Sequence, residues 1–148
     1  MTTSPLTLEQ VRIHAGSVSR DEAMREAAAI LEGAGAVTAD YYDAMLAREA
    51  AVSTYMGNEL AIPHGTNEAK AVVLGSALSV VRYDGGVDWD GEPVRFVIGI
   101  AGKDGAHLEL LSRIAIIFSD LDDVEELKAA ASADELYALL AAVNEDDA

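Results

Sequence analysis

Two apolar segments constrain the fold of this chain more than any other feature of its sequence. Residues 71–81 form an uncharged, β-branched run, and residues 94–101 form a second apolar run. Both lack helix-capping signals, and continuous apolar runs of this kind are typical of strands that are covered on both faces. We therefore predict strands at 71–82 and 94–101 in a central sheet with helices on each side.

The segments around these strands carry helix signals. Residues 19–22, Ser-Arg-Asp-Glu, form a capping box that predicts a helix ending at Gly33. A second helix is predicted from Thr38 to Glu49, and Arg48 lies near its carboxyl end, where a cation suits the helix dipole. Three further helices are predicted after residue 101: one with Asp104 as N-cap and apolar residues up to Phe118, one at 122–130, and one opened by a capping box at 132–135.

Shorter elements complete the pattern. Residues 60–62 predict a short strand that Pro63 ends, residues 83–86 predict a turn, and residues 87–89 alternate like a brief strand. No linker or repeat divides the chain. Its length and its pattern therefore predict one domain over residues 1–148.

The charge balance excludes several classes of function. Twenty-six acidic residues against ten basic ones give a formal charge of −16, the wrong sign for nucleic-acid phosphates or an anionic membrane surface. The chain has no cysteine, so disulfides, thiolate zinc sites and cysteine nucleophiles are excluded. Its amino terminus lacks a signal-peptide pattern, and its longest uncharged run is far shorter than the roughly 20 residues of a membrane helix. We expect a cytoplasmic protein without membrane insertion.

One histidine has an unusual backbone setting. His64 lies between Pro63, which fixes φ, and Gly65, which has no side chain, just after the predicted short strand. This setting exposes an imidazole at a strand end. Gly65 and Thr66 also offer backbone N–H groups and a hydroxyl to a bulky anion. On position alone an ordinary loop histidine is the commoner explanation, so both interpretations stay open here.

The other two histidines are weaker candidates. His107 lies in a predicted first helical turn, where amides and the helix dipole favour an anion, although a histidine that only bonds a core carbonyl fits as well. His14, in an extended amino-terminal segment, is interpreted as structural. The chain has no His-Glu-x-x-His pair, no P-loop and no dinucleotide-binding glycine motif. We expect no metal and no cofactor.

Three segments together resemble a known family. Residues 61–70, Ala-Ile-Pro-His-Gly-Thr-Asn-Glu-Ala-Lys, are similar to the active-histidine segment of the mannitol/fructose class of enzyme IIA in the bacterial phosphoenolpyruvate-dependent sugar phosphotransferase system. Residues 44–49 resemble its arginine-bearing helix, and residues 97–101 with 107–109 resemble its second-histidine segment. The continuation after the histidine is closer to the mannitol members than to the fructose or nitrogen-regulatory ones. Glu59 departs from the small residue expected there, and its carboxylate either tunes phosphate affinity or points to solvent.

The resemblance implies a fold and a set of roles. The fold would be a three-layer α/β sandwich with a central mixed β-sheet flanked by helices on both faces. His64 would accept a phosphoryl group on Nε2 from phospho-HPr and pass it to a cysteine of a IIB component, while Arg48 and His107 stabilise the group. The chemistry agrees, because a neutral imidazole is a nucleophile and phosphoryl transfer needs positioning and charge stabilisation.

Three functions remain as expectations. The first is a phosphocarrier subunit for mannitol or a related sugar, with the IIB and membrane components on separate chains because 148 residues leave no room for them. The second is a regulatory phosphoprotein like the nitrogen-branch relatives, and the third is an acidic binding module without phosphorylation. Residues 119–148 hold ten acidic residues and one lysine, which predicts either a solvated helix face or steering of a basic protein partner.

Overall fold

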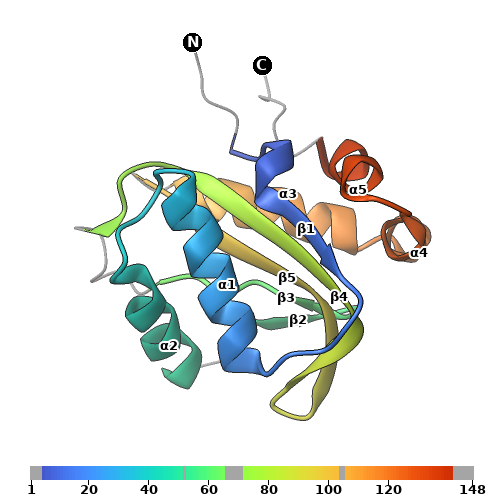
Figure 1. Ribbon diagram of the computed structural model, residues 1–148, viewed down its shortest axis with the longest axis horizontal. Coiled ribbons are helices and arrows are strands. Elements are labelled where there is room, and N and C mark those ends of the chain that lie inside the picture. The colour runs from blue at the N-terminus through green and yellow to red at the C-terminus, as the bar shows by residue number, and fades with distance from the viewer. Residues whose placement is uncertain (1–4, 52, 66–71, 104–105, 142–148) are drawn as a thin grey trace.

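The computed structural model describes residues 5–51, 53–65, 72–103 and 106–141, with the side chains of 106 and 107 excepted. A five-stranded mixed sheet forms its centre, and helices lie on both faces (Figure 1). The predicted α/β sandwich with a covered central sheet is confirmed. Among the described residues, no helix has the length and apolar character to cross a lipid bilayer.

The sheet has the strand order β1-β4-β5-β3-β2. Its two long strands, β4 (Ala77–Trp89) and β5 (Glu92–Ala101), pair antiparallel. Strand β5 contains the whole strand predicted at 94–101, whereas β4 begins only at Ala77, so residues 72–76 of the strand predicted at 71–82 lie outside it. On one side β1 (Val11–His14) pairs parallel with β4. On the other side β3 (Leu60–Ala61) pairs parallel with β5, and β2 (Tyr55–Gly57) pairs antiparallel with β3. The strands β1 and β2 are additions that the sequence analysis did not predict.

The predicted turn at residues 83–86 is wrong. Strand β4 continues through these residues, and its pairing with β5 shifts register between Arg82 and Val87. The chain reverses instead at Asp90 and Gly91, which both have positive φ and form a two-residue hairpin connection. The glycines that favour a turn also occur at irregularities within strands, so the local pattern does not separate the two structures.

Two helices cover one face of the sheet (Figure 1). Helix α1 (Arg20–Gly33) begins with the predicted capping box, because the Ser19 hydroxyl accepts from the Glu22 N–H and the Glu22 carboxylate accepts from the Ser19 N–H. Helix α2 (Tyr41–Ala51) begins three residues later than predicted. These helices bury alternate strand residues in one core cluster, among them Ala77, Val81, Tyr83, Val97 and Ala101.

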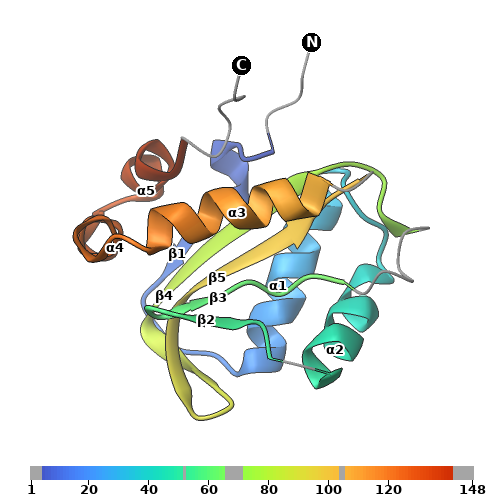
Figure 2. The ribbon, with the colours of Figure 1, turned by 180° about the vertical axis from the view of Figure 1, so that it is seen from behind.

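Three helices lie on the opposite face (Figure 2): α3 (Ala106–Phe118), α4 (Leu121–Ala129) and α5 (Ala133–Leu140). The Asp120 side chain caps α4. The Ser132 hydroxyl caps α5 as predicted, but the Glu135 carboxylate accepts from the Ala131 N–H, so only one half of the predicted capping box forms. The predicted cap Asp104 lies outside the described residues. A short 3-10 turn, η1 (Leu8–Gln10), precedes β1. The second core cluster takes the other alternate strand residues, among them Leu78, Val80, Phe96, Ile98 and Ile100.

Candidate functional site

His64 lies just beyond β3, beside the carboxyl end of β5. Its backbone forms an isolated parallel bridge with Ile100, and the Ile100 N–H donates to the Pro63 carbonyl at 3.1 Å. A proline has no N–H to donate to a sheet ladder, so the regular strand ends before it. The histidine is half-buried at the end of a strand, where its sequence setting predicts it.

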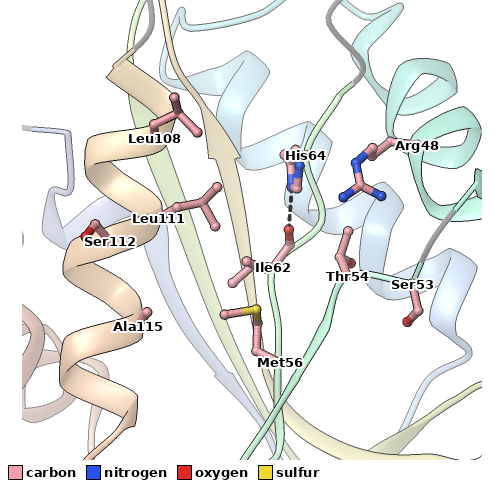
Figure 3. A pocket seen from close by; sticks show the side chains of 10 residues that line it. All are labelled: Arg48, Ser53, Thr54, Met56, Ile62, His64, Leu108, Leu111, Ser112 and Ala115. Carbon is pink, nitrogen blue, oxygen red and sulfur yellow. Dashed lines mark hydrogen bonds between the residues drawn. The ribbon is translucent and has the colours of Figure 1, made fainter.

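The orientation of the His64 ring is set by its own neighbourhood. Nδ1 lies 2.8 Å from the Ile62 carbonyl oxygen, as the dashed line in Figure 3 shows. A carbonyl oxygen can only accept, so Nδ1 must carry the proton in this hydrogen bond. In the neutral ring the lone pair is therefore on Nε2, which is the nitrogen available as a nucleophile.

A pocket of about 520 Å³ surrounds His64 (Figure 3). Arg48, in the last turn of α2, lines one side, and Figure 3 shows its guanidinium beside the His64 ring. The opposite wall is one face of α3, from Leu108 to Ala115. Besides His64 and Arg48, the residues that line the pocket are Ser53, Thr54, Met56, Ile62, Leu108, Leu111, Ser112 and Ala115.

The second-histidine segment is only partly described. His107 is the second residue of α3, but its side chain lies outside the described part of the chain, so its role stays a prediction. The helical turn that contains it borders the pocket at Leu108. The unpaired amides of a first helical turn carry partial positive charge, which favours an anion there.

His14 lies at the other edge of the sheet, on β1. Its Nε2 is 2.7 Å from a carboxylate oxygen of Glu26, and its ring stacks on Tyr83 with 5.5 Å between the centroids. These contacts connect β1, α1 and β4. They agree with the structural interpretation of this histidine.

Tyr41 holds the segment that follows His64. Its hydroxyl accepts from the Gly65 N–H at 2.8 Å and donates to the Ile100 carbonyl at 2.6 Å. Burial raises the pKa of the Tyr41 phenol, against a lowering by the Gly65 hydrogen bond, so the hydroxyl keeps the proton that it donates. A Cβ at position 65 would lie 2.7 Å from Tyr41 Cε1, so the close approach of the ring requires glycine here.

Most of the pocket wall was not predicted from the sequence. Four wall residues, Leu108, Leu111, Ser112 and Ala115, are spaced at i, i+3, i+4 and i+7 and therefore share one face of α3. That spacing was a usable signal, but the sequence alone does not tell which face of the helix meets the pocket. Ser53, Thr54 and Met56 come from the segment between α2 and β3, which carried no recognised motif.

Glu59 does not line the pocket. It occupies the turn between β2 and β3 with a φ of 65°, and its carboxylate pairs with Lys128 at 2.8 Å and with Arg95 at 3.4 Å. The carboxylate therefore pairs with α4 and does not simply point to solvent, while an effect of Glu59 on phosphate affinity stays a prediction. No group of three or more histidine or carboxylate side chains among the described residues is arranged to hold a metal ion.

This arrangement suits transfer of an anionic group between proteins. It combines a histidine whose neutral ring has its lone pair on Nε2, a guanidinium beside it and an open pocket with a largely apolar wall. A family model described as "Phosphoenolpyruvate-dependent sugar phosphotransferase system, EIIA 2" matches residues 4–143. The mannitol-specific phosphotransferase enzyme IIA component of Halalkalibacterium halodurans is 48% identical over 145 residues, which are 98% of this chain and 100% of that relative.

Two solved structures share the fold closely. The complex of enzyme IIAMTL and phosphorylated enzyme IIBMTL from Escherichia coli matches with a TM-score of 0.85 at 34% identity, covering 93% of this chain and 97% of that one. The nitrogen regulatory protein IIA-Ntr from Neisseria meningitidis matches with a TM-score of 0.79 at 30% identity, covering 92% of this chain and 96% of that one.

Proposed function

The chain belongs to the EIIA 2 family of the phosphoenolpyruvate-dependent sugar phosphotransferase system, and from this premise we propose that it is a phosphocarrier IIA component for mannitol uptake. It is a phosphotransferase whose His64 takes a phosphoryl group from phospho-HPr and passes it to the cysteine of a IIB component. The likeness to a mannitol component over nearly the whole chain supports the sugar. The likeness to a IIA protein in complex with phosphorylated IIB supports the partner.

One observation carries the proposal: the hydrogen bond from His64 Nδ1 to the Ile62 carbonyl, which leaves the lone pair on Nε2 inside the pocket beside Arg48. In the first step a bond forms from Nε2 to phosphorus while the phosphorus–nitrogen bond of the donor breaks. The donor ring leaves with the electron pair, and Nδ1 keeps its proton. The Ile62 carbonyl then stabilises the positive charge that the phosphorylated ring acquires.

The second step returns the site to its starting state. A thiolate of the IIB component attacks phosphorus, a phosphorus–sulfur bond forms, and the bond to Nε2 breaks. The ring becomes neutral again with its proton still on Nδ1. Both steps need in-line positioning and fixed positive charge, which Arg48 and His107 are proposed to supply. The proposed location is the cytoplasm, and residues 1–148 are proposed to act as one domain without cofactor, membrane insertion or nucleic-acid binding.

Labelling tests the proposal directly. Incubation with phosphoenolpyruvate, enzyme I and HPr should add one acid-labile phosphoryl group, and His64→Ala should abolish it. His14→Ala is the matched control, because that histidine lies at the other edge of the sheet, and it should be labelled like the wild type. Labelling that persists in His64→Ala would contradict the assignment of the acceptor.

A second function is kept because the IIA-Ntr protein shares the fold at 30% identity. In that case phosphorylation of His64 changes partner choice and does not feed sugar uptake. Transfer of label from the phosphorylated protein to a mannitol IIB component distinguishes the two, since only the phosphocarrier should lose its label to IIB. A protein that stays unlabelled throughout would instead be an acidic binding module.

A further inference from the structure

Glu49, the residue after Arg48, is a buried carboxylate that the phosphoryl-transfer scheme does not use. It is 5% exposed, and its two oxygens accept from the Thr54 N–H at 3.1 Å, from the Thr54 hydroxyl and from Trp89 Nε1 at 3.0 Å. Each of these partners is a donor, which matches an ionised carboxylate. Burying a charge is costly even when it is well satisfied, and an apolar residue of similar size often stabilises a core better.

A series of hydrogen bonds leads from Glu49 to the His64 ring. Beyond the carboxylate, the Thr54 carbonyl accepts from the Ile62 N–H at 3.1 Å. The Ile62 carbonyl in turn accepts from His64 Nδ1 at 2.8 Å. Thr54, Ile62 and His64 all line the pocket, so the buried carboxylate anchors the wall that orients the ring.

The same residue also connects two elements of the site. Glu49 belongs to the last turn of α2, directly after Arg48, and Trp89 at the end of β4 holds it from the sheet side. The Trp89 side chain is fully buried, so this anchor belongs to the rigid core. A hydrogen-bonded carboxylate at this position therefore sets where the end of α2 stands relative to the Ile62 carbonyl.

We infer that Glu49 is a positioning residue for phosphoryl transfer, an inference that rests on the proposed role of His64. It holds Thr54 and, through Thr54, the Ile62 carbonyl that keeps the His64 proton on Nδ1. When this acceptor moves, the neutral ring can take the other tautomer, with its proton on Nε2. That nitrogen then has no lone pair to accept a phosphoryl group.

The kinetic test compares two carboxylate-to-amide variants. Glu49→Gln keeps the shape of the side chain but turns an amide NH2 toward donors. Single-turnover transfer from phospho-HPr should slow by about tenfold or more, with the Kd for HPr unchanged, because a small misplacement of a reacting group is costly. Glu26→Gln is the matched control, because Glu26 also accepts several side-chain hydrogen bonds. Its partners His14 and Tyr83 belong to β1 and β4, at the opposite side of the sheet from β3 and the pocket. This control should transfer at the wild-type rate.

A second readout needs no phosphorylation. Nitrogen-15 NMR of the unphosphorylated protein reports the His64 tautomer, which should be almost entirely Nδ1–H in the wild type and a mixture in Glu49→Gln. A wild-type rate and tautomer ratio in Glu49→Gln would overturn the inference. So would a slowing shared by Glu26→Gln, since that would show only a loss of stability.

Two further outcomes have to be distinguished: a Glu49→Gln variant that does not fold, and a wild-type protein that HPr does not phosphorylate. If Glu49→Gln does not fold, Thr54→Val removes only the hydroxyl bond to Glu49 and keeps the side-chain shape and the backbone N–H. It should shift rate and tautomer in the same direction by a smaller factor, and wild-type behaviour would then overturn the inference. A wild-type protein that HPr does not phosphorylate contradicts the proposed function instead, while the tautomer comparison still tests Glu49.

Discussion

The imidazole of His64, the proposed phosphoryl acceptor, is oriented by a neighbour two residues away. The Ile62 carbonyl fixes both the proton on Nδ1 and the rotation of the ring, so the Nε2 lone pair needs no reorganisation before reaction. Arg48 beside it carries a permanent charge whose planar fork of N–H groups matches phosphoryl oxygens. A dianionic phosphoryl group on the proposed acceptor would depend on such local donors, because the chain as a whole is acidic.

Removal of the stabilising donors should slow transfer without unfolding the protein. Arg48→Ala should lower the single-turnover rate by about a hundredfold, the usual effect of losing one donor that acts on developing charge. Arg48→Lys should recover part of the rate, because it restores the charge without the two-pronged geometry. His107→Ala should also slow the relay. Rapid-quench measurements check these rates, and wild-type values in both alanine variants would contradict the roles assigned.

At the scale of elements, a buried arginine attaches α4 to the sheet. Arg82 on β4 is 5% exposed, and its Nη1 donates to the carbonyls of Leu127 and Ala130 at 2.8 Å each, where α4 ends. The last carbonyls of a helix have no partner within the helix and carry partial negative charge. The arginine satisfies them, and Asp84 on the same strand pairs with its Nε at 2.8 Å.

Loss of this attachment should destabilise the protein. Arg82→Met keeps the apolar stem but leaves buried carbonyls unsatisfied, so we expect the free energy of unfolding to fall by about 2–3 kcal/mol. Arg95→Met is the matched control, because the Arg95 side chain is 41% exposed where it pairs with Glu59, and its loss should cost less than about 1 kcal/mol. Urea denaturation measures both values. If both substitutions lower the free energy of unfolding equally, the hydrogen bonds from Arg82 to the end of α4 are not the cause of the destabilisation.

A carboxylate that connects three elements should make stability depend on pH. Glu26 on α1 accepts from His14, Tyr83 and Arg12. Burial alone would raise the pKa of Glu26, but these hydrogen bonds outweigh it and hold the pKa below the ordinary 4.5. The ionised form therefore stabilises the folded state fully above pH 4.5, and this contribution is lost as the pH falls through the lowered pKa.

The variant Glu26→Gln isolates this contribution. It should be less stable than the wild type at pH 7, and the difference in unfolding free energy should shrink as the pH falls below 4.5. Urea denaturation between pH 7 and the acid limit of folding measures the difference. A stability difference that is constant over this range would show that the ionisation of Glu26 contributes nothing.

At the scale of the whole molecule, the acidic charge is unevenly distributed. The acidic helices α4 and α5 follow the carboxyl end of α3 (Figure 2), whereas Figure 3 shows His64 at the level of Leu108 and Leu111, in the first half of α3. A helix of that length spans about 20 Å. Electrostatic screening acts over about 8 Å at physiological salt and about 30 Å at 0.01 M, so these helices can steer a partner toward His64 only at low salt.

Association with HPr should therefore depend on salt in a limited range. The stopped-flow association rate should fall between about 0.01 M and 0.1 M salt and then level off, as the distant acidic helices become screened. The dissociation rate should change less, because the contact itself lies on the apolar pocket wall. A rate that is flat over the whole range would show that the acidic surface serves solubility alone.

The local sequence was sufficient to predict the helix starts, the central strands and the setting of His64, because these features depend on residues that are close together in the chain. The capping box at residues 19–22 and the cap at Ser132 form because side chains and amides three residues apart meet in any helix start. The apolar runs gave the two central strands because such runs require burial on both faces. The setting of His64 at a strand end follows from Pro63 and Gly65.

Tertiary structure decided the rest, because the partners lie far apart in the chain. Strands β1 and β2 are too short to be predicted alone and exist through pairing with other strands. The glycines at 85 and 86 became part of β4 because β5 pairs on both sides of them. Glu49 meets Trp89 across 40 positions of sequence, and Tyr41 meets Gly65 across 24. Residue types and local spacing point to His64 as the proposed nucleophile, whereas only the packed sheet and helices bring the residues that support it together.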